Sequence, residues 1–183
     1  MSFLQSKKVV AEFNKFNEAI VAQARLNLSK VGGKHNSSTN ASGALSKSLS
    51  SSYEPSKNSF RLTFSMEDYG QFIDEGVKGV DSSAKAPKSE FSYKEGIQNK
   101  PSHKHFDKWL LRKGVSGTRN SKGQFIPRKS IAYAVSYGVW RKGIKATHFF
   151  TDAFEAKMKD FDKTMFKIIG FEVDELLTFA KKN

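Results

Sequence analysis

Apolar residues recur at helical spacing near both ends of the chain. Near the amino end they form one stripe within residues 5–31, and Gly32 and Gly33 end the pattern. The members of this stripe are Phe13, Phe16, Ile20, Ala24 and Leu28. Steps of three and four place these side chains on one face, so the pattern predicts an amphipathic helix that lies against a core.

A second helical pattern begins near Thr151 or Asp152 and continues almost to the end of the chain. Asp152 followed by Glu155 is typical of a capping box at a helix start. A helix of roughly 30 residues would extend about 45 Å, which is more than a small core covers. We therefore expect a break or bend at Gly170, or burial of part of the stripe by another subunit. The stripe comprises Phe154, Met158, Phe161, Met165, Ile168 or Ile169, Val173, Leu176 and Ala180.

Between these helices the pattern predicts a β-hairpin. Apolar and polar residues alternate over residues 59–65, as in a half-buried strand. Residues 50–56 are its expected partner, with a turn near Pro55 to Asn58.

A short helix is expected before this hairpin, and a short helix or turn after it. In residues 42–49 Ser42 is the expected cap, and Leu45 and Leu49 share one side. Residues 67–76 bring Tyr69, Phe72 and Ile73 together and end in glycine.

The middle of the chain alternates irregular and helical segments. Residues 77–100 are polar without clear periodicity, which predicts a long surface loop, and residues 32–41 predict a flexible one. Residues 101–114 predict a helix whose apolar face is Phe106, Trp109 and Leu110. Residues 115–129 predict a basic hairpin or loop. Residues 130–143 predict a helix with Ser130 as cap and a stripe of Ile131, Val135 and Val139.

These elements predict an α+β fold, in which a small antiparallel sheet packs with several helices, including a long amphipathic one at the carboxyl end. A single domain over residues 1–183 is expected. Only 38% of residues are hydrophobic, but 16 are Phe, so few large side chains can build the core. No apolar run approaches the roughly 20 residues of a membrane helix, and we expect no membrane contact. The absence of cysteine excludes disulfides and thiol ligands or nucleophiles.

The positive charge is concentrated in one part of the chain. Of the formal net charge of +13, most comes from residues 101–150, where eleven Lys and Arg accompany one acid, Asp107. Such a block predicts an anionic partner. The cations expected to contact nucleic acid or another anionic partner are Lys113, Arg119, Lys122, Arg128, Lys129, Arg141, Lys142 and Lys145. An anionic protein explains these charges about as well as nucleic acid does.

Catalytic and metal-binding patterns are weak. His103 and His105 are two residues apart and would point to different faces of a helix, and no carboxylate cluster accompanies them. The carboxylates of Asp74 and Glu75, which are adjacent in sequence, would also point in different directions on a helix. The phosphate-loop, nucleophile-elbow, zinc-protease and dinucleotide-binding motifs do not occur. We therefore expect no enzyme activity, no cofactor and no metal.

Three segments, in order along the chain, carry a resemblance. They are SGALSKSL at 42–49, YGQFIDEG at 69–76 and ATHFFTDAF at 146–154. Together they resemble the tail-completion, or head–tail joining (neck), proteins of tailed bacteriophages. In that family a helix, a short helix, a strand pair and an aromatic–acid–glycine turn precede a proline-and-phenylalanine entry to the last helix, and this chain has no proline directly before Phe149. The resemblance covers roughly residues 5–76 and 125–182.

The resemblance implies a structural virion protein. It would form a ring, hexameric or matched to the symmetry of its neighbours, between the portal or adaptor and the tail, with transient nonspecific DNA contact as DNA passes through. The subunit would assemble in the host cytoplasm and end in the virion. Tyr69, Phe72, Phe149 and Phe150 are its expected subunit-interface residues, although core packing is the simpler expectation for at least one of the two adjacent phenylalanines. The alternative is a nonspecific nucleic-acid-binding protein that uses the basic residues 101–150.

Overall fold

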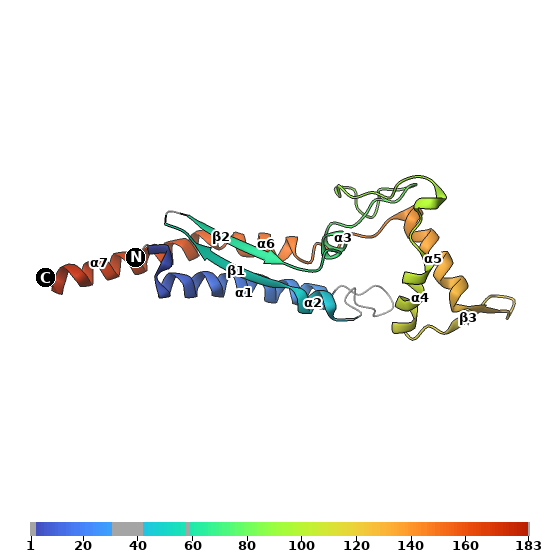
Figure 1. Cartoon of the computed structure of the whole chain (residues 1–183), viewed down its shortest axis with the longest axis horizontal. Helices are drawn as coiled ribbons and strands as arrows, with labels where there is room; N and C mark the ends of the chain where they lie inside the picture. The colour runs from blue at the N-terminus through green and yellow to red at the C-terminus, as the bar shows by residue number, and fades with distance from the viewer. Residues whose placement is uncertain (1–2, 31–41, 58, 183) are drawn as a thin grey trace. The chain divides into compact units, whose positions relative to one another are not determined.

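The computed structural model describes residues 3–30, 42–57 and 59–182 (Figure 1). The flexible loop expected over residues 32–41 lies outside these described residues. The chain divides into two compact units. The first unit is Met1–Leu28, Ser46–Glu67 and Phe149–Asn183, and the second is Ser29–Leu45 and Asp68–His148. Helices and two antiparallel two-stranded sheets make up the described chain, so the predicted α+β class is confirmed.

The first unit is built on a long helix and a hairpin. Helix α1 (Lys7–Lys30) follows the short η1 (Phe3–Gln5), and β1 (Ser50–Pro55) pairs antiparallel with β2 (Phe60–Ser65). The register joins Ser50 to Ser65 and Pro55 to Phe60, which places the turn where the sequence predicted it. The hairpin runs alongside α1 (Figure 1). The short α2 (Ala44–Ser48) precedes β1, and Ser42 accepts a hydrogen bond from the Ala44 N–H, 3.4 Å away.

Aromatic rings join α1 to the hairpin. Phe13 is fully buried and stacks on Tyr53, with ring centroids 4.6 Å apart, and it also contacts Phe60 at 4.7 Å. Val9 and Ile168 are buried in the same cluster. The predicted stripe of the first helix is confirmed, because all five of its members are buried. Few but large side chains therefore do form this core.

The carboxyl-terminal helix breaks at a different place from the one the sequence suggested. Helix α6 (Thr151–Met158) ends at a turn over residues 159–160, and α7 (Phe161–Lys182) then continues through Gly170. The break has a packing reason, because Phe154 on α6 contacts Phe64 of the hairpin whereas Phe161 contacts Phe16 of α1. The two halves follow different surfaces. The break at Gly170, one of the two alternatives that the sequence left open, does not occur, because α7 is continuous there.

The second unit contains a helix pair and a small hairpin. Its elements in order are α3 (Gly70–Asp74), η2 (Ile97–Asn99), α4 (His103–Arg112), β3 (Gly117–Arg119), β4 (Phe125–Pro127) and α5 (Arg128–Lys142). Helices α4 and α5 lie side by side (Figure 1). Residues 115–129 therefore contain a hairpin, with Gly117 paired to Pro127 and Arg119 to Phe125.

Helix α5 differs from its prediction in both its start and its buried face. It begins at Arg128, directly after Pro127, and Ser130 is not its cap. Its buried residues are Ala132, Ser136 and Trp140, whereas the predicted stripe of Ile131, Val135 and Val139 is only half-buried. The small side chains on the buried face admit neighbouring backbone. Ser136 donates a hydrogen bond to the carbonyl of Pro101, and the Trp140 indole donates to the carbonyl of Lys94 at 3.0 Å.

The segment 77–144 begins and ends at two backbone stretches that are paired with each other. Val77 and Ile144 exchange two backbone hydrogen bonds, at 3.0 and 2.8 Å. Gly143 has φ of 74°, and a Cβ there would lie 2.1 Å from the Val77 carbonyl oxygen, so only glycine fits. The irregular segment 77–100 is held by its own backbone bonds, including Lys78 N–H to Phe91 O at 2.9 Å and Tyr93 N–H to Lys78 O at 3.0 Å.

Candidate nucleic-acid interface

A groove lined almost entirely by polar and charged side chains lies beside the helix pair of the second unit. We call it the basic groove. Helix α4 supplies four of its residues, the β3–β4 hairpin and the approach to it supply two, and the first two residues of α5 supply the rest. The lining consists of His103, Lys104, Asp107, Lys108, Ser116, Pro127, Arg128 and Lys129.

Helix α4 places its groove residues by simple helical spacing. Ser102 caps the helix, because its hydroxyl accepts a hydrogen bond from the Lys104 N–H at 3.4 Å. Residues four apart lie one above the other on a helix, so His103 lies over Asp107 and Lys104 over Lys108. Leu110 is buried on the opposite side, which turns these polar residues outward.

One ion pair joins the two helices across the groove. The Arg128 Nε lies 2.7 Å from Asp107 Oδ1, and a second guanidinium nitrogen lies 3.3 Å from Oδ2. The hydrogen bonds from Arg128 hold the pKa of the Asp107 carboxyl below its usual value, and the same pair raises the pKa of Arg128. The only acid of residues 101–150 is thereby neutralised by a neighbour. Lys104, Lys108 and Lys129 are exposed and give the groove a net positive charge.

An aromatic ring borders the groove. The Tyr133 ring is exposed on α5, and the ring of His103 lies 6.0 Å from it. The Lys100 ammonium lies 4.3 Å from the centre of the same ring and donates a hydrogen bond to the Ser136 hydroxyl at 3.0 Å. Lys100 therefore adds a further cation beside the groove, held over an aromatic face.

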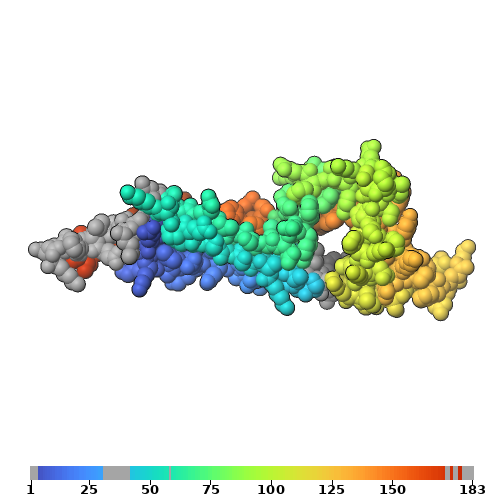
Figure 2. All heavy atoms as spheres, viewed as in Figure 1, coloured from blue at the N-terminus to red at the C-terminus, as the bar shows by residue number. Residues whose placement is uncertain are grey.

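The predicted cations do not form one cluster. Arg128 and Lys129 line the basic groove. Arg119 and Lys122 lie on the β3–β4 hairpin, which projects beyond the two helices in the sphere view (Figure 2), and Lys113 ends α4. Arg141 and Lys142 lie at the far end of α5, about 20 Å along the helix from Arg128. Lys145 lies beyond that end. Arg141 is engaged there by Asp81 and by the Tyr137 hydroxyl, the latter at 3.0 Å.

The tip of the β3–β4 hairpin is closed by its own hydrogen bonds. The Asn120 side-chain oxygen accepts from the N–H groups of Lys122 and Gln124, at 3.0 and 2.9 Å. Arg119 donates to the carbonyl of Gly123 at 2.7 Å. Phe125 is exposed, and its ring covers the backbone of Gly117. The tip therefore presents basic side chains from an ordered turn.

Two of the eight described lining residues, Arg128 and Lys129, were among the predicted contacts. Sequence reasoning did not assign the other six to such a site, namely His103, Lys104, Asp107, Lys108, Ser116 and Pro127. The predicted apolar face of α4 contained the signal, because polar residues at positions 104 and 108 fall opposite Leu110 on the same helix. No sequence signal indicates that the start of α5 lies next to this face, since that depends on how the hairpin turns.

The expected subunit-interface residues divide into core and surface. Phe149 is fully buried within the first unit, and Asn27 donates to its carbonyl at 3.0 Å, as the core alternative for one phenylalanine predicts. Phe149 is therefore not a surface residue. Phe150 is half-buried against Phe64, with ring centroids 5.5 Å apart. In the second unit, Tyr69 is 41% exposed and Phe72 is 37% exposed.

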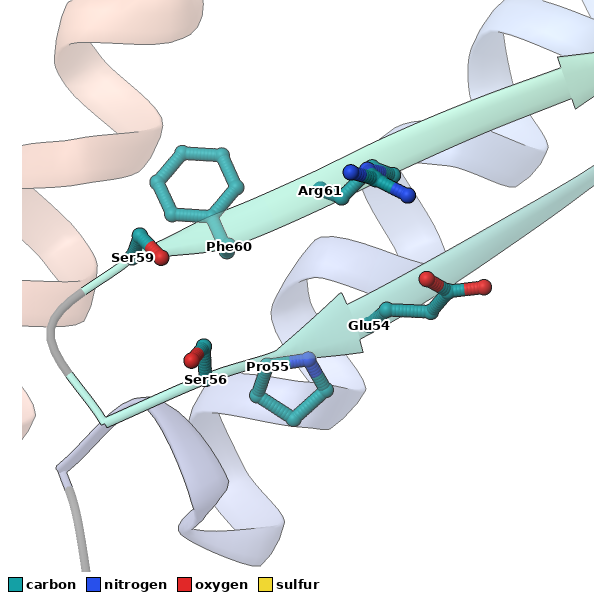
Figure 3. Close-up of a pocket in the computed structure, with 6 residues that line it drawn as sticks. All are labelled: Glu54, Pro55, Ser56, Ser59, Phe60 and Arg61. Carbon is teal, nitrogen blue, oxygen red and sulfur yellow. The ribbon is translucent and has the colours of Figure 1, made fainter.

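A second, smaller pocket lies at the turn of the β1–β2 hairpin (Figure 3). Its lining is Glu54, Pro55, Ser56, Ser59, Phe60 and Arg61. Glu54 and Arg61 face each other across the strands. Among the described residues of this lining, Glu54 is the carboxylate, and no histidine or lysine accompanies the two serines as a base.

Among the residues whose side chains the structure describes, no three His, Asp or Glu come together as metal ligands. Among the described helices, none combines the length and the apolar character needed to cross a bilayer.

Comparison of the chain with models of protein families, with curated proteins and with solved structures found no match in any of the three. A functional assignment therefore rests on the geometry above and on the motifs themselves.

Proposed function

We propose that the chain is a structural subunit of the neck of a tailed bacteriophage, a tail-completion protein without catalytic activity. Its partners are further copies of itself in a ring, the portal or adaptor on one side and tail proteins on the other, with DNA passing through. It assembles in the host cytoplasm and ends in the virion.

One observation carries this proposal. Two of the three segments that resemble neck proteins lie about 70 residues apart in sequence and are joined by backbone hydrogen bonds. The Thr147 N–H donates to the carbonyl of Asp74 at 3.0 Å, and the His148 N–H donates to the same carbonyl at 2.9 Å. The Thr147 hydroxyl also donates to the carbonyl of Ile73 at 2.8 Å. The segment that enters the last helix thus caps the end of α3.

The same joint closes the long excursion that lies between these two segments. Gly76, the last residue of the second segment, has φ of 75°, and a Cβ there would lie 2.6 Å from the Ala146 nitrogen. Directly beyond it, Val77 and Ile144 begin and end the long excursion that carries the basic groove. This arrangement supports a compact assembly subunit with an added basic element, because the excursion can vary without disturbing the joint.

Exposed apolar surface supports an assembled state. On α7, Ile168 is fully buried while Phe166 is 75% exposed, so the helix carries apolar side chains on more than one face. Tyr69 and Phe72 are also large exposed apolar side chains on the second unit. Contiguous exposed apolar surface marks interaction sites, and these side chains are the ones that the proposal assigns to contacts with neighbouring subunits.

The experiment is the solution mass of the purified protein by light scattering over a concentration series, without DNA, followed by electron microscopy of any assembled species. Rings of closed symmetry, alone or after mixing with the portal, adaptor and tail proteins of the same phage, are expected. A chain that remains monomeric even with those partners would contradict the proposal.

A paired variant tests the interface residues. The double change Tyr69→Ala and Phe72→Ala should leave a folded monomer that no longer assembles. Ile97→Ala, which truncates another exposed apolar side chain of the same unit, is the matched control and should assemble normally. Equal assembly by both variants would remove Tyr69 and Phe72 from the interface.

A nonspecific nucleic-acid-binding protein is the second candidate function, and the basic groove is the observation that favours it. The same light-scattering series with duplex DNA distinguishes the two. A stable monomer that coats DNA at physiological salt, and forms no ring with the neighbouring proteins, would replace the neck proposal with this one.

A further inference from the structure

We propose that the basic groove is a binding site for the phosphate backbone of duplex DNA, contacted by Lys104, Lys108 and Lys129 and read without regard to base sequence. The inference deepens the proposed function and rests on it in one respect only, namely that duplex DNA, rather than RNA, is the polyanion that the protein meets.

The first argument is the net positive charge that the groove keeps once Arg128 and Asp107 have paired. Arg128 and Asp107 satisfy each other through two hydrogen bonds, at 2.7 and 3.3 Å. Among the described residues of the lining, the charged groups that remain are Lys104, Lys108 and Lys129. A cleft lined by one sign of charge focuses its field and attracts the opposite charge.

The second argument is what the groove lacks for binding another protein. Protein interfaces are anchored by buried aromatic or aliphatic side chains that fill pockets. Of the eight described residues of this lining, Pro127 is apolar and the other seven are charged or polar, and the exposed Tyr133 lies beside the lining rather than in it. Phosphate groups need cations and hydrogen-bond donors rather than apolar anchors, so the composition favours nucleic acid over an acidic protein.

The third argument is spacing. Lys104 and Lys108 are four residues apart on α4, which places them about 6 Å apart along its axis. Lys129 approaches from the start of α5 on the other wall. A DNA strand carries one phosphate per roughly 3.4 Å of helix axis, so successive phosphates can meet more than one of these lysines.

The fourth argument concerns base reading. Side chains that recognise bases in pairs of hydrogen bonds are Arg, Lys, Asn and Gln projecting into a groove of the duplex, whereas lysine also binds phosphate as a point charge. Among the described residues of the lining there is no Asn or Gln, and Arg128 is held by Asp107. Asn120 and Gln124 at the nearby hairpin tip hydrogen-bond to each other at 2.9 Å. The site is therefore expected to bind DNA of any sequence.

The test compares two triple variants with the same charge change. The groove variant carries Lys104→Gln, Lys108→Gln and Lys129→Gln. The control variant carries Lys8→Gln, Lys47→Gln and Lys159→Gln, which removes three exposed lysines from the first unit. Binding of a fluorescent duplex of arbitrary sequence is measured by anisotropy at several salt concentrations, and circular dichroism checks that both variants are folded.

Each lysine that contacts a phosphate releases counterions and makes the slope of log K against log salt more negative by about 0.9. The slope of the groove variant should therefore be less negative than that of wild type by about 2.7 in total. The control variant should keep nearly the wild-type slope, and a duplex of scrambled sequence should bind equally well. Equal losses in both variants would show that only net charge matters and would overturn the inference. Wild-type protein that does not bind the duplex at low salt would do the same.

Two competitors distinguish other polyanions. Single-stranded RNA that binds more tightly than the duplex and shows the groove-specific loss would overturn the assignment to DNA. Polyglutamate that displaces the duplex at equal charge concentration would overturn it in favour of an acidic protein. Weaker competition by both is the expected result.

Ring assembly is measured on the same variants without DNA. A groove variant that assembles normally but loses duplex binding supports the inference. Assembly together with unchanged duplex binding would overturn the inference and leave the proposed function standing. Groove-specific duplex binding by a wild-type chain that never assembles would contradict the neck proposal while supporting the groove as a phosphate site.

Discussion

Arg128 and Asp107 hold the start of α5 against the outer face of α4 through two parallel hydrogen bonds, at 2.7 and 3.3 Å. The bidentate geometry suits a guanidinium and a carboxylate, and lysine cannot reproduce it. The pair fixes one wall of the basic groove relative to the other and removes the single negative charge from its lining.

The pair predicts a pH-dependent contribution to stability. Because Arg128 lowers the pKa of Asp107 in the folded chain, the contribution is fully present above the ordinary value of 3.8 and is lost as pH falls through the lowered folded-state pKa. Wild type should therefore unfold at a higher temperature than Asp107→Asn at neutral pH, and the difference should shrink below 3.8. Thermal unfolding followed by circular dichroism across this pH range measures it.

The control for this prediction is Glu90→Gln, which neutralises an exposed carboxylate of the same unit. It should follow wild type at every pH. A difference between wild type and Asp107→Asn that does not change with pH would mean that the ion pair contributes nothing through its charge.

Gly143 should tolerate no side chain. Its φ of 74° lies in the left-handed region, and an added Cβ would lie 2.1 Å from the Val77 carbonyl oxygen. Gly143→Ala should lower the free energy of unfolding by at least about 1–3 kcal/mol, the usual penalty for such a conformation, with the clash in addition. Gly138→Ala is the matched control, because a Cβ at Gly138 meets nothing within 4 Å and α5 should gain about 0.5–1 kcal/mol. Denaturant unfolding that gives the same value for both variants would contradict the geometry of the Val77–Ile144 pair.

Phe149 should behave as a core residue. It is fully buried, so Phe149→Ala should cost about 3–5 kcal/mol in the free energy of unfolding through lost burial and the cavity left behind. Phe166→Ala, at a side chain that is 75% exposed, should change the free energy of unfolding by less than about 0.5 kcal/mol. Urea unfolding of the two variants at equal concentration provides the measurement. A Phe149→Ala chain that is folded and stable but does not assemble would instead assign Phe149 to the subunit interface.

Gly170 should be replaceable with a gain. Helix α7 continues through it, and a Cβ there meets nothing within 4 Å. Gly170→Ala should therefore stabilise the helix by about 1 kcal/mol, since alanine loses less backbone freedom on folding. An unfolding temperature above that of wild type, followed by the helical circular dichroism signal, would support this result. A loss of stability would point to a bend at Gly170, as its sequence context suggested.

Much of the fold follows from local patterns. The stripe from Phe13 to Leu28 predicted α1, and the alternation over residues 59–65 predicted β2 together with its partner and turn. These elements are decided by side-chain periodicity and turn residues, which act within a few positions of one another. The break at residues 159–160 could not be found in this way, because α6 and α7 separate only where Phe154 and Phe161 pack on different surfaces.

The candidate site shows the same division. The concentration of charge in residues 101–150, with Asp107 as the lone acid, is a property of the sequence alone. The pairing of Asp107 with Arg128, the separation of Arg141 from the groove and the burial of Phe149 depend on which helix faces meet. The sequence by itself determined the helices, the first hairpin and the sign of the charge, because periodicity and composition are local. Tertiary structure decided which cations share a groove and which aromatic rings are buried, because those outcomes depend on contacts between residues far apart in the chain.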